Sequence, residues 1–355
     1  MKIKKTVLTK MDSCYAVNCF NISGRLFYAA APDSHGKAVM IDSEKEKEEL
    51  IWKEPGGTMS FVAIPGKEGE FLSVQNFFPG FDSRHTLLVW CKRHDELGWI
   101  IKPLLHIPYI HRFDIFRMGR VNYLLVCTLC TNKDNINDWT SPGEVWAGIL
   151  PEDPDNTPDM EVILGGLTKN HGYCRVVQDG KDYGLAGCDN GIFEIYPPQN
   201  TEDSWEIRQI ADFPVSDVAV CDIDHDNKLE YMTIEPFHGN RFVIYKRNGK
   251  NFTKIWEYQD GVEFGHVVWG GTFFGMPIFI GGFREGNAEL FCVFPDQKQR
   301  DKLEKCTLDD GQGPANVCVI HEEDKVKILT SNHKAGELVL YELTQEGEGH
   351  AKDIK

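Results

Sequence analysis

A unit of four short strands, which returns along the whole chain, limits the possible folds more than any other feature. It is clearest in residues 168–210, where HGYCRVVQ, KDYGLAGC, GIFEIYP and WEIRQI are separated by turns. Two of these turns contain DG at 179–180 and DNG at 189–191, residue types that adopt the left-handed backbone angles of tight hairpins. Four antiparallel strands joined in this way are typical of one blade of a β-propeller.

The unit occurs seven times, at a spacing of roughly 45 to 60 residues, and predicts an all-β, seven-bladed β-propeller of four-stranded antiparallel blades. A single domain, 1–355, is expected to hold the blades, which start near residues 13, 58, 111, 171, 217, 266 and 316. Either the N-terminal segment or the C-terminal strand ELVLYEL is expected to complete a blade, and SEKEKEEL at 43–50 is predicted as a charged, helix-prone connector. A pair of β-sandwiches is the competing architecture, but it does not explain the recurring first strand and its preceding loop.

Charge and composition narrow the class of partner. The net charge of −16 and the pI near 5.2 argue against nucleic acid or an anionic membrane, because phosphates would be repelled. The chain has no signal-like apolar core and no run of 18 apolar residues, so a cytoplasmic protein is expected. The eleven cysteines are interpreted as small buried hydrophobes in a reducing compartment. Cys127 and Cys130 have C-x-x-C spacing, but in a strand they face opposite sides, which disfavours a zinc knuckle.

Histidines recur at equivalent places of the predicted blades. In a propeller, the loop entering the first strand and the loop between the second and third strands open on the same face. The entry position in blades three, four and six is occupied by His111, His171 and His266. The second-to-third-strand loops of blades one, five and seven contain His35, His238 and His333. One rim of the propeller is therefore predicted to be rich in imidazoles.

These histidines predict a metal site at the mouth of the channel. Neutral imidazoles are the commonest ligands of divalent transition ions, and three of them leave a coordination position open for water or substrate. The expected cofactor is a divalent ion of the zinc, manganese or magnesium class, bound by His111, His171 and His266, with a fourth ligand from His238, His333 or water. The alternative is that each histidine is an ordinary hydrogen-bonding surface residue.

A second candidate ion site has different chemistry. Acidic residues stand at alternate positions of one compact loop: Asp222, Asp224, Asp226 and Glu230. Hard oxygen ligands in this arrangement suit calcium, which would have a structural role on the face opposite the histidines. The alternative is an exposed acidic turn, since Asn227 replaces the glycine that usually follows the third aspartate of such loops.

The loop DIDHDNKLEYMTI at 222–234 resembles the repeat loop of FG-GAP or VCBS-type propeller proteins, with weaker echoes in VVQDGKDYGLAG and VIHEEDKVKILTS. The histidine ring resembles the metal-bearing propellers of aldos-2-ulose (anhydrofructose) dehydratases and of propeller-type oligogalacturonide lyases, through NHGY at 170–173, GH at 265–266 and IH at 110–111. The resemblance implies a carbon–oxygen lyase that eliminates water or an alkoxide from an oxidised sugar: a keto-sugar, a keto-glycoside or a uronide.

The chemistry of such an elimination assigns further candidate roles. A metal bound to the substrate carbonyl stabilises an enolate, while a base removes the α-proton. The candidate bases are His238, His333 and Tyr173. The candidate substrate-binding residues are Arg284 and Lys334 for hydroxyls or an anionic group, and Trp139 and Phe78 for stacking on the sugar. Each charged one could instead be a plain surface charge, and each aromatic one a loop-packing anchor.

Two other function classes remain open. A non-catalytic propeller that binds a glycan or a protein needs no metal. A glycosidase would need two carboxylates, for which the candidates near the rim are Asp217, Glu235 and Glu263. The sequence contains neither a G-x-S-x-G turn nor a glycine-rich phosphate loop, which disfavours nucleophilic hydrolysis and phosphoryl transfer.

Overall fold

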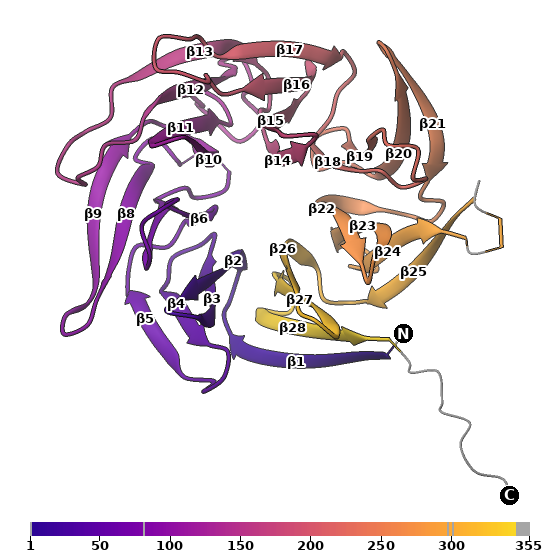
Figure 1. The fold of residues 1–355 in the computed structure, drawn as a ribbon, viewed down its shortest axis with the longest axis horizontal. Coiled ribbons are helices and arrows are strands. Elements are labelled where there is room, and N and C mark those ends of the chain that lie inside the picture. The colour runs from indigo at the N-terminus through magenta and orange to yellow at the C-terminus, as the bar shows by residue number, and fades with distance from the viewer. Residues whose placement is uncertain (1, 81, 297, 300–301, 346–355) are drawn as a thin grey trace, which may run out of the picture.

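Seven four-stranded antiparallel sheets stand around a central channel (Figure 1). The computed structural model describes residues 2–80, 82–296, 298–299 and 302–345, and all of its regular elements in this part of the chain are strands. The predicted seven-bladed all-β propeller is therefore confirmed. The first strand of every blade starts within three residues of its predicted position. None of the described segments is a helix that is long and apolar enough to cross a membrane.

Each blade is a meander whose innermost strand lines the channel. The strands of blades one to three are β2 (Cys14–Ile22), β3 (Arg25–Pro32), β4 (Ala38–Asp42), β5 (Glu48–Trp52); β6 (Phe61–Ala63), β7 (Glu70–Gln75), β8 (Leu87–His94), β9 (Gly98–His106); and β10 (Ile110–Met118), β11 (Val121–Thr128), β12 (Gly143–Ile149), β13 (Met160–Leu167). Those of blades four and five are β14 (Gly172–Gln178), β15 (Lys181–Cys188), β16 (Gly191–Tyr196), β17 (Glu206–Ala211); and β18 (Asp217–Cys221), β19 (Glu230–Glu235), β20 (Arg241–Asn248), β21 (Asn251–Glu257). Those of blades six and seven are β22 (Glu263–Phe273), β23 (Met276–Glu285), β24 (Leu290–Pro295), β25 (Leu303–Asp309); and β26 (Pro314–His321), β27 (Lys325–Asn332), β28 (Glu337–Thr344), β1 (Lys2–Lys10).

The ring is closed by strands from both ends of the chain. β1 pairs antiparallel with β28 and forms the outer strand of blade seven. The two strands lie side by side in Figure 1. The C-terminal strand is thus an interior strand, and the N-terminal one completes the sheet. Closure removes two free sheet edges that could otherwise pair with another chain.

The prediction of a helix-prone connector at 43–50 is wrong. The carboxylate of Asp42 accepts hydrogen bonds from the backbone N–H groups of Glu44 and Lys45, at 3.0 and 3.2 Å, which stabilises a turn there. The remaining residues enter β5, which pairs with β4 as the outer strand of blade one. Pairing to an existing sheet edge therefore overrides the helix propensity of the charged residues.

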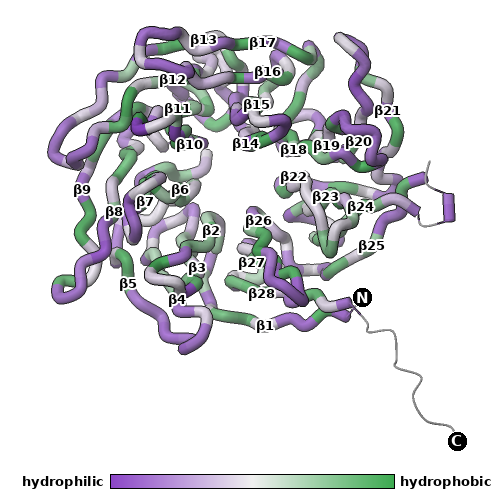
Figure 2. Tube along the Cα trace, in the orientation of Figure 1, coloured by the Kyte–Doolittle hydropathy of each residue, from purple (hydrophilic) through white to green (hydrophobic). Residues whose placement is uncertain are grey.

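The core lies between the blades. Aromatic side chains of neighbouring blades pack in pairs: Phe20 on Phe71, with ring centroids 5.0 Å apart, and Phe242 on Phe291 at 5.1 Å. Figure 2 shows the hydrophobic stretches within the strands and hydrophilic residues in many outer turns, such as the one between β8 and β9. Since each blade packs between two neighbours, the second strands of the blades are buried on both faces, as in β11 and β19.

Candidate functional site

The loops that enter the innermost strands share one backbone geometry, and this geometry builds the site. In six blades a residue with positive φ stands two positions before an equivalent residue at the channel mouth. The positive-φ residues are Ser13, Gly57, Tyr109, Lys169, Phe264 and Gly313. The residues that follow them two positions later are Tyr15, Met59, His111, His171, His266 and Ala315. Strand register shifts at Tyr15, His111, His266 and Ala315, and such bulges redirect a side chain, here toward the channel.

Three of these six residues are histidines, and the next blade holds each of them in the same way. The Nδ1 atoms of His111, His171 and His266 lie 3.1, 3.3 and 2.6 Å from backbone carbonyl oxygens. Those oxygens belong to His171, Ser216 and Ala315, the equivalent residues of the following blades. A carbonyl can only accept, so each Nδ1 carries the proton and each Nε2 keeps its lone pair. This backbone bond to the second nitrogen is typical of metal-ligating histidines.

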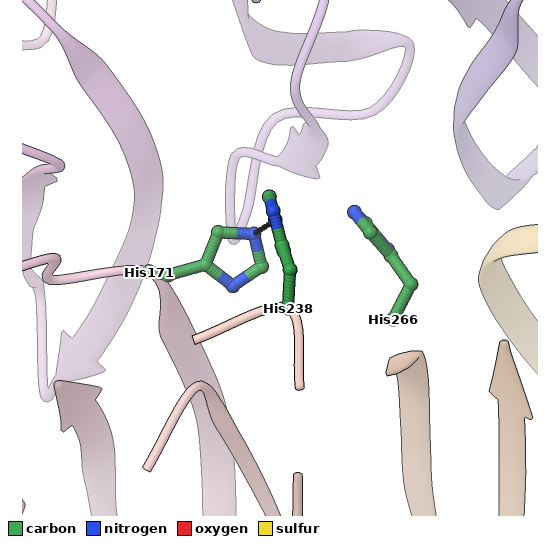
Figure 3. Close-up of side chains that lie close together, drawn as sticks. All are labelled: His171, His238 and His266. Atoms are coloured by element: carbon green, nitrogen blue, oxygen red, sulfur yellow. Dashed lines mark hydrogen bonds between the residues drawn. The ribbon is translucent and has the colours of Figure 1, made fainter. Parts of the chain in front are cut away.

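His238 joins two of them in a cluster. It lies in the loop between β19 and β20, at a φ of 46°, and its backbone N–H donates to Ser216 Oγ at 3.1 Å. Its Nε2 lies 3.1 Å from Nε2 of His171, and the ring of His266 stands beside them (Figure 3). The three side chains offer nitrogens that all lie within 4.8 Å of one another. Two nitrogen ligands of one tetrahedral zinc ion stand roughly 3.3 Å apart, so the observed separation fits a shared ion.

His111 lies beside this cluster rather than in it. Its ring centroid is 4.4 Å from that of His171, but the group of three that can hold one ion consists of His171, His238 and His266. Burial lowers the pKa of His111, His171 and His266 well below the usual value. Burial and the nearby Arg284 lower the pKa of His238 to about 3. All four rings are therefore neutral at neutral pH, the form that binds metals.

A cavity of about 450 Å³ opens onto the cluster, a size that suits a small organic ligand. Its aromatic lining consists of Tyr15, Phe77, Phe78, Tyr109, Trp139, Phe237 and Phe264. Its charged lining consists of Asp33, Lys133, Lys169 and Arg284. Among the described residues around this cavity, Asp33 supplies the carboxylate. The two-carboxylate alternative is not favoured, because Asp217, Glu235 and Glu263 lie outside the lining.

Asp33, His333 and Arg284 form a hydrogen-bonded group from three blades. His333 Nε2 lies 3.1 Å from both carboxylate oxygens of Asp33, and a guanidinium nitrogen of Arg284 lies 2.8 Å from the imidazole nitrogens. Asp33 is 4% exposed, and it lines the cavity together with Arg284, whereas His333 stands behind them. His333 therefore positions Asp33 and does not itself face the cavity.

The polar insertion in blade three covers one side of the cavity. Lys133 is 2% exposed, and its ammonium donates to the carbonyl of Ile136 at 2.7 Å. The same ammonium lies 3.4 Å from the ring centroid of Trp139, which packs edge-on against Phe237. One face of the Trp139 indole is thus occupied by a cation, which leaves less of it for stacking on a sugar. Phe78 lines the cavity, with its ring 4.4 Å from that of His35.

Two predicted site residues lie away from the cavity. Tyr173 donates its hydroxyl to Asp114 at 3.0 Å and lines a second cavity of about 380 Å³ deeper in the channel. Burial and the neighbouring carboxylate raise its pKa well above the usual value, so it is a poor base. Lys334 lies outside the lining, half-exposed, with its ammonium 3.4 Å from Glu285.

The acidic loop joins β18 to β19, at the end of β18 away from the histidines. Asp222, Asp224 and Asp226 approach one another as the calcium prediction requires. However, the ammonium of Lys246 pairs with Asp224 and lies 2.8 Å from Asp226. Glu230 is fully buried, and burial raises its pKa to about 7. Calcium would have to displace the ammonium, and calcium binding stays a prediction.

The comparisons with known proteins identify the fold and not a family. No family model matches the chain, and no curated protein does. The proposed resemblance to FG-GAP proteins, dehydratases and oligogalacturonide lyases therefore has no support from them. The β-propeller domain of Cps50 (Swd1) from Myceliophteria thermophila is similar in structure, with a TM-score of 0.56, 11% identity and coverage of 97% of this chain and 100% of that one. Sqt1 from Saccharomyces cerevisiae has a TM-score of 0.55, 9% identity and coverage of 96% and 98%. The chain is a seven-bladed β-propeller with a histidine-rich cavity at one mouth of its channel.

Proposed function

We propose that this propeller is a metal-dependent carbohydrate lyase that performs β-elimination on an oxidised sugar. The observation that carries the proposal is the tautomer of the channel histidines. Backbone carbonyls fix the proton of His171 and His266 on Nδ1, so two Nε2 lone pairs face the cavity beside His238. A purely structural role would not require three imidazoles to bring their nitrogens together beside a ligand-sized cavity.

A divalent ion bound there would act as a Lewis acid on the substrate carbonyl or carboxylate and so acidify the neighbouring C–H. Of the groups in the lining, Asp33 is the best placed to take the α-proton, because His333 and Arg284 orient its buried carboxylate. The hydroxyl of Tyr15, 3.4 Å from His266 Nε2, stays protonated because burial raises its pKa. It is therefore suited to donate a proton to the leaving oxygen.

The charge of the lining favours a uronide among the three oxidised sugars. The described lining of the cavity contains three cationic side chains and one carboxylate: Lys133, Lys169 and Arg284, and Asp33. Lys169 pairs with Asp189 at 2.7 Å, whereas Lys133 has a backbone carbonyl and an aromatic ring as partners. A buried ammonium in such surroundings gains from an anionic ligand, and a positive cavity in an acidic protein draws anions toward it.

A second candidate is a non-catalytic module that binds a glycan or a protein at the same mouth. The comparisons favour this alternative, since neither of the two similar solved structures is described as a lyase. The aromatic lining also suits a bound glycan without chemistry. The convergent imidazoles are what favour the lyase.

The test is a panel of uronides, keto-sugars and unoxidised glycosides, incubated in deuterated water with and without a chelator. A lyase gives an unsaturated or dicarbonyl product with new ultraviolet absorbance, and solvent deuterium appears at the α-carbon. We expect turnover of oxidised substrates only, and its loss with chelator. Turnover of unoxidised glycosides, or a turnover rate that the chelator does not change, would refute the proposal. Binding without turnover across the panel would establish the second candidate instead.

A further inference from the structure

Two cysteines meet where the ring closes, outside the lining of the histidine cavity. Cys19 lies in β2 and Cys318 in β26, the innermost strands of the first and last blades. They are 299 residues apart in the chain, yet their sulfurs are 3.4 Å apart. Both side chains are half-buried in the packing between blades one and seven. A disulfide needs a separation of about 2.05 Å, so a small side-chain rotation would bring the sulfurs into bonding distance.

The surroundings give the two sulfurs different roles. Cys318 donates its S–H to Cys19, whose backbone N–H bonds to Asn18. The hydrogen bond from Cys318 lowers the pKa of Cys19, although burial opposes it, while the same bond and burial raise the pKa of Cys318 well above the usual value. Asn18 and Val317, their sequence neighbours, line the second channel cavity of about 380 Å³. Cys19 and Cys318 are themselves only partly buried, so a small oxidant can approach them.

We propose that Cys19 and Cys318 form a reversible disulfide, made by a peroxide, that locks the first blade to the last. The thiolate of Cys19 attacks one peroxide oxygen and breaks the O–O bond, giving a sulfenic acid and, after protonation, one water. Cys318 then loses its proton and attacks the Cys19 sulfur, and the hydroxyl leaves as the second water. Two thiols are oxidised by two electrons, and one peroxide is reduced to two waters.

Another cysteine pair provides a matched control. Cys292 and Cys306 are directly opposite each other on β24 and β25, within one blade, and the pKa of Cys306 is lowered to about 6 by its neighbour. A bond between them would close a short loop inside one sheet. A bond between Cys19 and Cys318 would close nearly the whole chain, and loop-closure entropy then predicts a rise in melting temperature of about 8 °C for a protein of this size.

The experiment uses the reduced full-length chain, treated with one equivalent of hydrogen peroxide at neutral pH and then alkylated. Non-reducing digestion and mass spectrometry should find the Cys19 peptide linked to the Cys318 peptide. The melting temperature should rise by about 8 °C and return to its original value after addition of dithiothreitol. Cys19→Ser and Cys318→Ser should each abolish the shift, whereas Cys306→Ser should keep it.

Recovery of both Cys19 and Cys318 as alkylated thiols, or of Cys19 as a sulfinic acid with Cys318 still free, would overturn the proposal. So would a dithiothreitol-sensitive rise in melting temperature that persists in Cys19→Ser. If the serine variants do not fold, the linked peptide and the melting shift of the unmodified sequence decide the question.

Discussion

The contribution of β28 to ring closure can be tested by ending the chain at Gly336. This change removes five apolar side chains, each at most 7% exposed: Leu338, Val339, Leu340, Tyr341 and Leu343. At about 2 kcal/mol for each buried side chain, the loss is about 10 kcal/mol, as large as the entire stability of many domains. It also exposes the edges of β27 and β1. We therefore expect no soluble folded protein.

Removal of β1 provides the contrast, because it is the outer strand of the same blade. Ile3 and Leu8 are half-buried, and Val7 is 43% exposed. Burial of this extent contributes about 3 kcal/mol, so a chain that starts at Met11 should fold with lower stability. The loss of β28 and the loss of β1, two strands of similar length, should thus differ by about 7 kcal/mol in their effect on the free energy of unfolding.

Soluble expression, size-exclusion chromatography and urea unfolding followed by circular dichroism measure the difference. A chain ending at Gln345 is the control, since it retains all four strands of blade seven. Cooperative unfolding of the chain ending at Gly336, with a free energy within about 3 kcal/mol of the control, would refute the calculation. It would mean that β28 does not close the ring.

Three substitutions and one pH dependence give further predictions. Lys305→Met removes the ion pair of the buried Glu289, at 2.7 Å, and should lower the free energy of unfolding by about 3 kcal/mol in urea denaturation. Burial alone would raise the pKa of Glu289, but hydrogen bonds from Lys305, a threonine and a tyrosine lower it below its usual value. The stabilisation by the Glu289 carboxylate should therefore be full above the unfolded pKa of about 4.3 and decline below it. Melting temperatures measured over a pH series would show this decline. Gly172→Ala would place a Cβ 2.6 Å from the backbone of blade five, so it should displace His171 and weaken metal binding in calorimetry. Lys246→Met frees the acidic loop, and calcium should then raise the melting temperature of this variant more than that of the unmodified chain.

The fold could be predicted from the sequence because local chemistry specifies each blade. The glycine- and asparagine-containing turns and the short apolar strands recur with one period, and each hairpin forms from neighbouring residues. The connector at 43–50 could not be predicted in the same way. It ends in β5, an outer strand with charged residues that exists because a sheet edge is available beside it. That edge is a property of the fold and not of the segment.

The site was predictable only in part. His171 and His266 follow from residue type and the position at which the chain enters a blade. Tyr173 was assigned to the same mouth, but two residues along a strand are enough to move a side chain to the deeper cavity. Asp33 and Lys133 come from loops of blades one and three and are brought to the cavity by closure of the ring. Tyr15 also stands two positions after a positive-φ residue, but these residues are of five different types, so the sequence carries no common signal that would identify it.

The central claim is that the histidine cluster binds one divalent ion, and calorimetric titration of chelator-treated protein with zinc or manganese tests it most directly. We expect one equivalent to bind to the unmodified chain. His171→Ala and His266→Ala should weaken binding more than about 100-fold without changing the β-rich circular dichroism, since each removes a direct ligand. His321→Ala, at an exposed position of β26, should bind as the unmodified chain does. No binding by the unmodified chain, or unchanged affinity and stoichiometry in His171→Ala, would contradict the account.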